Sequence, residues 1–360
     1  DGRAHVDYGF HMIVSDPTPE VLEKELPQLI REGYTSFKIY MTYDDLKLND
    51  GQILDVLDVA RKYDATAMIH AENADCIQWL TKRLEASGRS APRYHAVSRP
   101  MLVEREATHR AIALSELADV PILIVHVSGR EAVEQIRWAR SHGMNIMAET
   151  CPQYLFLSAE DLGIDDSYQG AKCVCSPPPR DQANQEVIWN GLNDGLFTVF
   201  SSDHAPFNYD SPEGKKPNGE EVSFGHIPNG IPGIETRLSL LYTHGVLTGR
   251  MTLNRFVELT STNPAKVYGL HPRKGSIAIG ADADLVVWQE GERAISNRDL
   301  HHNVDYTPYE GQQLKAWPCL TLSAGQVVWD GEQFHARAGS GRFLQRGAPT
   351  LLPKRHQARF

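Results

Sequence analysis

Four apolar runs, each carrying one ionisable side chain, constrain the fold of this chain more than any other feature. Three of the runs end in a residue able to bind metal, at His70, His126 and Asp203. The fourth, residues 36–43, carries Lys38 within a predicted buried strand. An unpaired ammonium is costly to bury, so Lys38 must be paired, neutralised, bound or long enough to keep its charge in water. Each of the four runs thus supplies one side chain that could bind metal, and (β/α) barrels build their active sites at the C-terminal ends of strands.

Helical spacing of apolar residues recurs between these runs. Strands that alternate with helices imply a parallel sheet, and ligands at several strand ends favour a TIM-type (β/α)8 barrel over an open sheet. Residues 206–232 are rich in Gly, Pro and Asn and are predicted to form an active-site loop, whereas 87–100 are predicted to be a polar loop. The predicted strands are 8–14, 36–43, 65–70, 121–126, 145–151 and 197–203, and the predicted helices include 21–31, 51–63, 74–86, 104–117 and 130–141.

The pattern changes to short β-strands after the barrel, with strands predicted at 285–288 and 325–329. We therefore predict three parts. Residues 1–273 form the barrel of an α/β fold, 274–348 form a small β-sandwich appendage, and 349–360 form a basic tail that is solvated or reaches a neighbouring subunit.

Composition excludes several classes of function. The formal net charge of −10 argues against a protein that binds the phosphate backbone of nucleic acids. No apolar run approaches the roughly 18 residues needed to span a bilayer, and the N-terminus has no secretory pattern. The five cysteines are odd in number, and the Cys173-x-Cys175 pair has no second pair to complete a structural zinc site. We therefore expect a reducing, cytoplasmic location.

The ionisable residues of the four runs could converge on metal. Neutral imidazole and carboxylate are ordinary zinc ligands, but a lysine amine keeps its proton up to a pH of about 10. Reaction with CO2 would convert Lys38 into a carbamate whose two oxygens could bridge two metals. Bridged metals would make hydroxide available near neutral pH, and Asp203 could then carry its proton to a leaving nitrogen.

Six short motifs carry a resemblance to a known family. They cover the chain in the family's order and at similar spacing, and together they are highly specific. The motifs are SFKIYMTY at 36–43, HAEN at 70–73, HVSG at 126–129, CSPP at 175–178, SSDH at 201–204 and PNG at 228–230. On these residues the chain resembles the amidohydrolase superfamily, and within it the cyclic-imide hydrolases of the dihydropyrimidinase and D-hydantoinase branch.

The resemblance implies a site with two Zn²⁺ ions per subunit. Lys38 matches the carboxylated lysine that bridges both metals, and His70 and His126 match ligands of one metal. Asp203 matches a ligand of the other metal and the catalytic acid/base. Taken alone, a histidine at a strand end is more often structural than a ligand.

The resemblance also implies roles in substrate binding. Tyr43 matches the tyrosine that stabilises the oxyanion, and Ser176 and Asn229 match residues whose backbone groups hold the ureide of the ring. Alone, Tyr43 would be a packed aromatic and Ser176 an ordinary turn residue. His11, His204 and His226 are predicted to be structural or loop residues, and His204 could alternatively support a metal ligand from behind. A small cyclic ureide or imide as substrate, no nucleic acid or membrane partner, and a homotetramer are what the resemblance implies.

One part of the family pattern is missing. The family's first barrel strand carries a His-x-His pair that supplies two further ligands, and this sequence has no His-x-His; His301 and His302 are adjacent and lie in the appendage. The strand predicted at 8–14 resembles the family's third. The sequence begins at Asp1 rather than methionine, so we expect it to be a piece of a longer protein that lacks roughly 100 residues, the usual size of two β/α units with some appendage strands.

Three functions remain open at this point. The favoured one is hydrolysis of a dihydropyrimidine or a 5-substituted hydantoin by a metal-bound hydroxide. The second is a non-catalytic scaffold similar to the collapsin response mediator proteins; the four retained candidate ligands argue against it, and the missing His-x-His argues for it if the chain truly begins at Asp1. The third is an allantoinase or dihydroorotase, which Tyr43 and the CSPP run fit less well.

Overall fold

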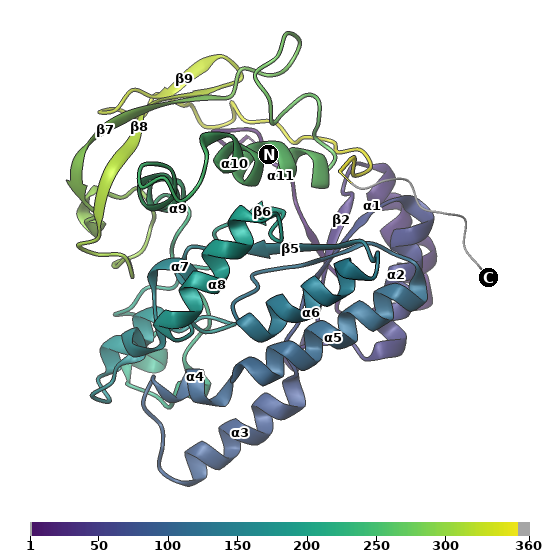
Figure 1. Ribbon diagram of the computed structural model, residues 1–360, viewed down its shortest axis with the longest axis vertical. Coiled ribbons are helices and arrows are strands. Elements are labelled where there is room, and N and C mark those ends of the chain that lie inside the picture. The colour runs from purple at the N-terminus through teal and green to yellow at the C-terminus, as the bar shows by residue number, and fades with distance from the viewer. Residues whose placement is uncertain (1, 352–360) are drawn as a thin grey trace.

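Six parallel strands form the central sheet of the structure, a computed structural model that describes residues 2–351. Each strand pairs with the next one in the chain, and helices connect successive strands along the outer face (Figure 1). Among the described residues β1 and β6 are the two edges, so the strands form an arc of a barrel. The strands are β1 Met12–Ile13, β2 Ser36–Tyr40, β3 Thr66–His70, β4 Ile122–Ile124, β5 Ile146–Thr150 and β6 Val199–Phe200.

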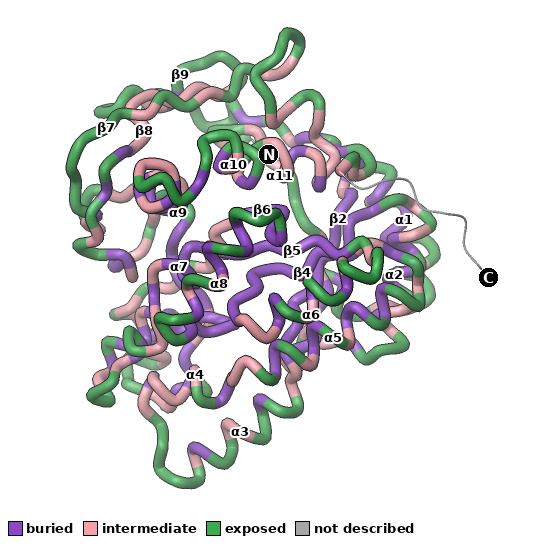
Figure 2. Tube along the Cα trace, in the orientation of Figure 1, coloured by how far each residue is buried: buried purple, intermediate pink, exposed green. Residues whose placement is uncertain are grey.

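The register of the sheet places Lys38 on its inner face. Lys38 pairs with Met68, Met68 with Leu123, and Leu123 with Met147. The last three belong to an inner apolar cluster, whereas Phe37 belongs to the larger cluster between the sheet and the helices. The two clusters follow from the period-two alternation of side chains along a strand. Figure 2 shows that the chain is buried along β4 and β5.

Local sequence explains where the helices begin and which face they bury. In α2, Asp50–Tyr63, the Asn49 side chain accepts from the Gln52 amide at 3.0 Å and Gln52 reciprocates, which caps the helix. Ile53, Val56, Leu57 and Ala60 recur at helical spacing and are buried. The other helices are α1 Leu26–Arg31, α3 Ala74–Ala86, α4 Tyr94–Ser98, α5 Met101–Ala118, α6 Arg130–Ser141, α7 Gln153–Phe156, α8 Gln182–Asn193, α9 Arg237–Leu241, α10 Leu253–Val257 and α11 Asn263–Val267.

A three-stranded antiparallel sheet forms the appendage. It consists of β7 Leu285–Ala294, β8 Gln313–Ser323 and β9 Gln326–Trp329, in the order β7-β8-β9. The strands predicted at 285–288 and 325–329 are confirmed, and β8 was not predicted. Trp288 stacks on Tyr242 with ring centroids 4.6 Å apart, which joins the appendage to the helices after β6.

Two local predictions need correction. The polar loop predicted at 87–100 contains α4, because the buried His95 and Ser98 give this stretch a packed inner face. The strand predicted at 8–14 joins the sheet only at Met12–Ile13, since Tyr8 forms a bridge with Phe343 instead. The division into parts at 273 and 348 stays a prediction, and residues 352–360 of the predicted tail lie outside the described residues. Within residues 2–351, no helix has both the length and the apolar character needed to cross a membrane.

Candidate active site

The parallel strands bring the predicted ligands to one end of the sheet. His70 is the last residue of β3, and His126 and Asp203 follow β4 and β6 within three residues. Lys38 lies in β2, next to the strand that ends in His70. Because the carboxyl ends of parallel strands meet at one edge, side chains far apart in the sequence gather there.

Two neutral histidines meet at the centre of this edge. His70 Nδ1 and His126 Nε2 lie 3.0 Å apart, and each residue is only 2% exposed. Burial lowers the pKa of His70 and holds the pKa of His126 well below its usual range, and the nearby charge of Lys38 contributes to both. Both imidazoles are therefore uncharged near neutral pH, which is the form that binds metal.

Glu72 fixes the orientation of His70. Its carboxylate lies 2.8 Å from His70 Nε2 and accepts a hydrogen bond from the Nε2–H group. The unprotonated Nδ1 of the neutral imidazole therefore faces His126. Burial opposes the charge of Glu72, but Arg99 and His70 hold its pKa at about 2. A carboxylate behind a histidine is the usual support of a metal ligand.

Only part of a metal-binding donor set is present. One nitrogen of the imidazole pair must keep a free lone pair, and His126 Nδ1 is buried without a hydrogen-bond partner. Lys38 takes part in no ion pair among the described residues, and its Nζ lies 4.9 Å from the centre of the Tyr40 ring. Within residues 2–351, however, no three His, Cys, Asp or Glu side chains are grouped closely enough to hold an ion. The imidazole pair and the unpaired lysine thus fit a metal site whose remaining ligands are not assembled in this part of the chain.

Backbone strain concentrates at the same place. Tyr43, His126 and Asp203 have positive φ angles of 67°, 41° and 45°. Non-glycine residues rarely adopt this conformation, and such residues cluster at functional sites. Three of the predicted site residues therefore share a feature that their sequence motifs do not display.

Tyr43 lies beside the histidine pair as a protonated phenol. Its ring centre is 5.5 Å from that of His70 in an edge-on arrangement. Burial raises the pKa of Tyr43 to about 12. The hydroxyl therefore remains a hydrogen-bond donor throughout the neutral range.

Ser176 and Asn229 are brought together by a backbone contact. The amide of Gly230 donates to the carbonyl of Val174 at 3.0 Å, which joins the CSPP and PNG segments. Ser176 Oγ and Asn229 Oδ1 are both buried and have no hydrogen-bond partner among the described residues. Buried polar atoms are normally paired, so these two atoms are available to a ligand.

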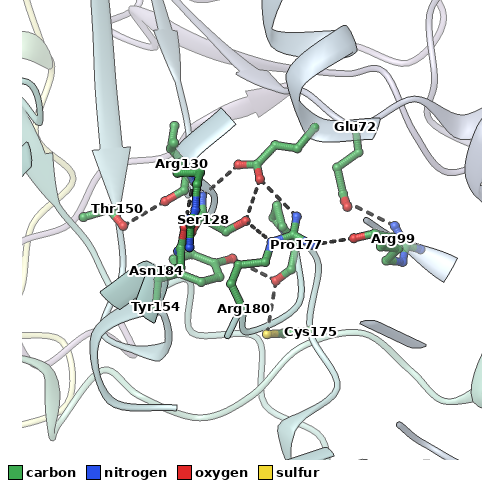
Figure 3. Close-up of polar contacts among 12 residues, drawn as sticks. Glu72, Arg99, Ser128, Arg130, Thr150, Tyr154, Cys175, Pro177, Arg180 and Asn184 are labelled. Carbon is green, nitrogen blue, oxygen red and sulfur yellow. Dashed lines mark hydrogen bonds and ion pairs between the residues drawn. The ribbon is translucent and has the colours of Figure 1, made fainter. Parts of the chain in front are cut away.

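A buried polar network supports the site from behind (Figure 3). Glu72 pairs with Arg99 at 3.2 Å, and Arg180 donates to the Arg99 carbonyl. Arg180 also pairs with Glu104 at 3.0 Å and donates to Ser128 Oγ at 2.9 Å, while the Ser128 hydroxyl donates to Glu104 at 2.6 Å. The network therefore links the carboxylate behind His70 to the segment that follows His126.

Sequence reasoning missed several of these residues. Arg99, Glu104 and Arg180 carry no motif, and only their burial together reveals them. Glu149 was also missed, although a charged residue within the predicted strand at 145–151 was a signal of the same kind as Lys38. Burial raises the pKa of Glu149, which lies near Lys38.

Two of the three histidines predicted to be structural or loop residues have hydrogen-bond partners of their own. His11 Nδ1 lies 2.6 Å from Ser36 Oγ, and burial lowers the pKa of His11 to about 4. His204 accepts from the amides of Gly233 and Ile234 at 3.1 and 3.3 Å. His226 ends a short 3-10 turn in the 206–232 loop. His11 and His204 thus have structural partners of their own.

A parallel β/α sheet with neutral histidines, an unpaired lysine and an aspartate at its carboxyl edge defines the class of metal-dependent hydrolase barrels. The chain belongs to the Amidohydrolase family, whose profile matches residues 5–328. The predicted family and fold class are thereby confirmed.

Several similar proteins are hydantoinases or dihydropyrimidinases. The chain is 44% identical to the D-hydantoinase of Ralstonia pickettii over 96% of its own length and 74% of that protein. It is 45% identical to the D-hydantoinase of Geobacillus stearothermophilus over 96% of this chain and 73% of that one. The dihydropyrimidinase structure from Brevibacillus agri superposes with a TM-score of 0.92 at 44% identity, covering 96% of this chain and 75% of that chain.

The Glu104–Arg180 pair should contribute strongly to stability. Glu104→Ala leaves the Arg180 charge buried without its carboxylate, and we expect the free energy of unfolding to fall by about 3–5 kcal/mol. Urea denaturation measures this change. The double variant Glu104→Leu/Arg180→Met removes both charges and should lose less than the single variant; a larger loss would contradict the role assigned to the charge pair.

His95 should make the protein less stable in acid. Its Nε2 donates to the Cys175 carbonyl at 2.8 Å, and burial lowers its pKa to about 3. In the unfolded chain His95 takes up a proton below an ordinary pKa of about 6.5, whereas in the folded protein it stays neutral. The contribution of neutral His95 to the free energy of unfolding is therefore intact above pH 6.5 and falls by ~2 kcal/mol at pH 5.

The test compares urea unfolding at pH 7 and pH 5. In His95→Gln the decrease in the free energy of unfolding from pH 7 to pH 5 should be smaller by that ~2 kcal/mol than in the parent. The exposed control His109→Gln should behave as the parent. An unchanged pH dependence in His95→Gln would rule out the buried neutral histidine as its source.

Proposed function

We propose that this chain hydrolyses the cyclic amide bond of 5-substituted hydantoins or dihydropyrimidines. The observation that carries the proposal is the convergence of the neutral His70–His126 pair and the unpaired Lys38 at the carboxyl edge of the sheet. The relatives named as D-hydantoinases are 44% and 45% identical across nearly the whole chain. A D-5-substituted hydantoin is therefore the first substrate to test.

The proposed cofactor is a pair of Zn²⁺ ions. The ions would be held by Lys38 as a carbamate and by His70, His126 and Asp203. Further ligands would be needed in addition to these four residues. When bound, such ions polarise the scissile carbonyl and lower the pKa of water. The support for this assignment is the free lone pair on the histidine pair and the absence of an ion-pair partner for Lys38 among the described residues.

The chain's own residues supply the remaining steps. The Tyr43 phenol donates a hydrogen bond to the carbonyl oxygen that gains charge during attack. The Asp203 carboxylate takes up the proton released by the attacking water and delivers it to the ring nitrogen that leaves. Ser176 and Asn229 hold the ureide of the ring in place.

A second candidate function is a non-catalytic relative of these hydrolases. It is favoured by one observation, that no complete group of three acidic, histidine or cysteine ligands is assembled within residues 2–351. Metal content and turnover separate it from the hydrolase.

The assignments of assembly and location are proposals as well. All five cysteines are free, and three of them are buried, which supports a reducing, cytoplasmic location. The proposed partner is the small cyclic ureide substrate, and the homotetramer rests on the family resemblance.

Lys38→Met should strongly reduce metal binding. Protein purified without chelators in bicarbonate buffer should contain about two zinc ions per chain, as a binuclear hydrolase requires, and the variant should contain far less. Elemental analysis by mass spectrometry measures the content. Lys62→Met, at an exposed position of α2, is the matched control and should keep the parent content. Parent protein without metal would favour the non-catalytic relative.

Tyr43→Phe should separate catalysis from metal binding. Loss of the phenol hydrogen bond should lower kcat for a 5-substituted hydantoin by about 10²–10³-fold, the usual effect of removing one oxyanion donor. Metal content should stay at the parent value, because the phenol is not an expected ligand. A variant with unchanged kcat would remove Tyr43 from the proposed mechanism.

A further inference from the structure

Lys215 is a fully buried lysine that the site described above does not use. It lies in the 206–232 loop and is 0% exposed. Among the ion pairs of the described residues none involves Lys215, although a buried ammonium without a counter-charge is costly. Its position therefore calls for a specific reason.

The ammonium group of Lys215 bridges the two segments that are predicted to bind substrate. Its Nζ donates to the carbonyl of Val174 at 2.8 Å and to the carbonyl of Pro228 at 2.6 Å. The Val174 carbonyl also accepts from the Gly230 amide at 3.0 Å. The Lys215 ammonium and the Gly230 amide thus both bind the Val174 carbonyl, and the ammonium also binds the Pro228 carbonyl. We call this set of hydrogen bonds, which connects the CSPP and PNG segments, the junction.

Hydrogen bonds of the loop backbone fix the position from which the Lys215 side chain extends into the protein. The Lys215 amide donates to the Asn208 carbonyl at 2.8 Å, and the Tyr168 hydroxyl donates to the Lys215 carbonyl at 2.6 Å. At Gly214 a Cβ would lie 2.0 Å from the Asn208 carbonyl oxygen, so only glycine fits there. Local contacts on both sides therefore set where the ammonium can reach.

We propose that Lys215 is a positioning residue for substrate recognition, which sets the spacing between Ser176 and Asn229 by holding the Val174 and Pro228 carbonyls. Each of these carbonyls lies within two residues of a predicted substrate contact. The buried, unpaired Ser176 Oγ and Asn229 Oδ1 show that this junction leaves polar atoms free for a ligand. The inference rests on the proposed function, because it assigns Lys215 to the ureide subsite of that same reaction.

Burial lowers the pKa of Lys215 to about 7. A neutral amine still carries two N–H groups, so both carbonyls can be held in either protonation state. The bridge therefore depends on the presence of the amine and its length.

Binding of a ureide that cannot be hydrolysed tests the inference independently of turnover. 2-Imidazolidinone has the N–C(=O)–N group of a hydantoin ring but lacks the second ring carbonyl that would be attacked. Its Kd for the full, metal-loaded chain is measured by ligand-observed NMR. Lys215→Met keeps most of the apolar stem of the side chain but has no N–H group to bridge the carbonyls. We expect Kd to rise about tenfold, as for loss of hydrogen bonds that organise a site.

Lys216→Met is the matched control. Lys216 is the next residue in the loop, is partly exposed, and pairs with Asp210 at 2.9 Å. Its Kd for 2-imidazolidinone should equal that of the parent. Lys215→Gln, which is shorter but keeps an N–H donor, should give an intermediate Kd and serves if Lys215→Met does not fold.

Turnover of a 5-substituted hydantoin in the same variants gives a second readout. If Lys215 positions the ureide subsite, KM should rise in Lys215→Met while kcat changes much less. A purely structural residue would instead lower the apparent kcat through the folded fraction and leave KM unchanged. A parent protein that binds the probe without hydrolysing hydantoin would overturn the proposed function but not this inference. A parent that does not bind the probe, or a folded Lys215→Met with the parent Kd, would overturn the inference.

Discussion

The in-register pairing of the parallel strands is the constraint on which the rest of the structure depends. Lys38, Met68, Leu123 and Met147 lie side by side on one face of four strands, while Phe37 packs on the other face against the helices. A shift of one residue would reverse both faces, bury the lysine among the helices and turn a core phenylalanine toward the site. The same register aligns the strand ends, so the apolar core and the polar edge are consequences of one arrangement.

Burial of charge separates the supporting residues of the site from its reactive ones. Glu72 and Glu104 are buried with arginine partners, and these pairs support the segments that carry His70 and His126. Lys38 and Lys215 have no carboxylate partner among the described residues. The surroundings of the two amines differ. Lys38 faces the neutral histidines, and Lys215 donates hydrogen bonds to two backbone carbonyls. Both lysines occur where the chain is predicted to contact metal or substrate.

Much of the fold and part of the site could be predicted from local patterns. The strands that bear Lys38, His70 and His126, and the helices between them, follow from periodicity and capping. The helix at 94–98 and strand β8 could not be predicted in this way, because packing against distant residues decides both. Glu104 and Arg180 escaped prediction for a similar reason, since they are 76 residues apart and only folding makes them partners.

The sequence by itself determined the family, the alternation of strands and helices and the identity of the candidate ligands, since these depend on residue types and short spacings. Tertiary structure alone decided that His70 and His126 meet at 3.0 Å, and that burial keeps both neutral. It also decided that Lys215 joins two segments distant in the chain. The physical reason is that pKa values, hydrogen-bond partners and desolvation depend on what lies within a few ångströms in space, which local sequence does not specify.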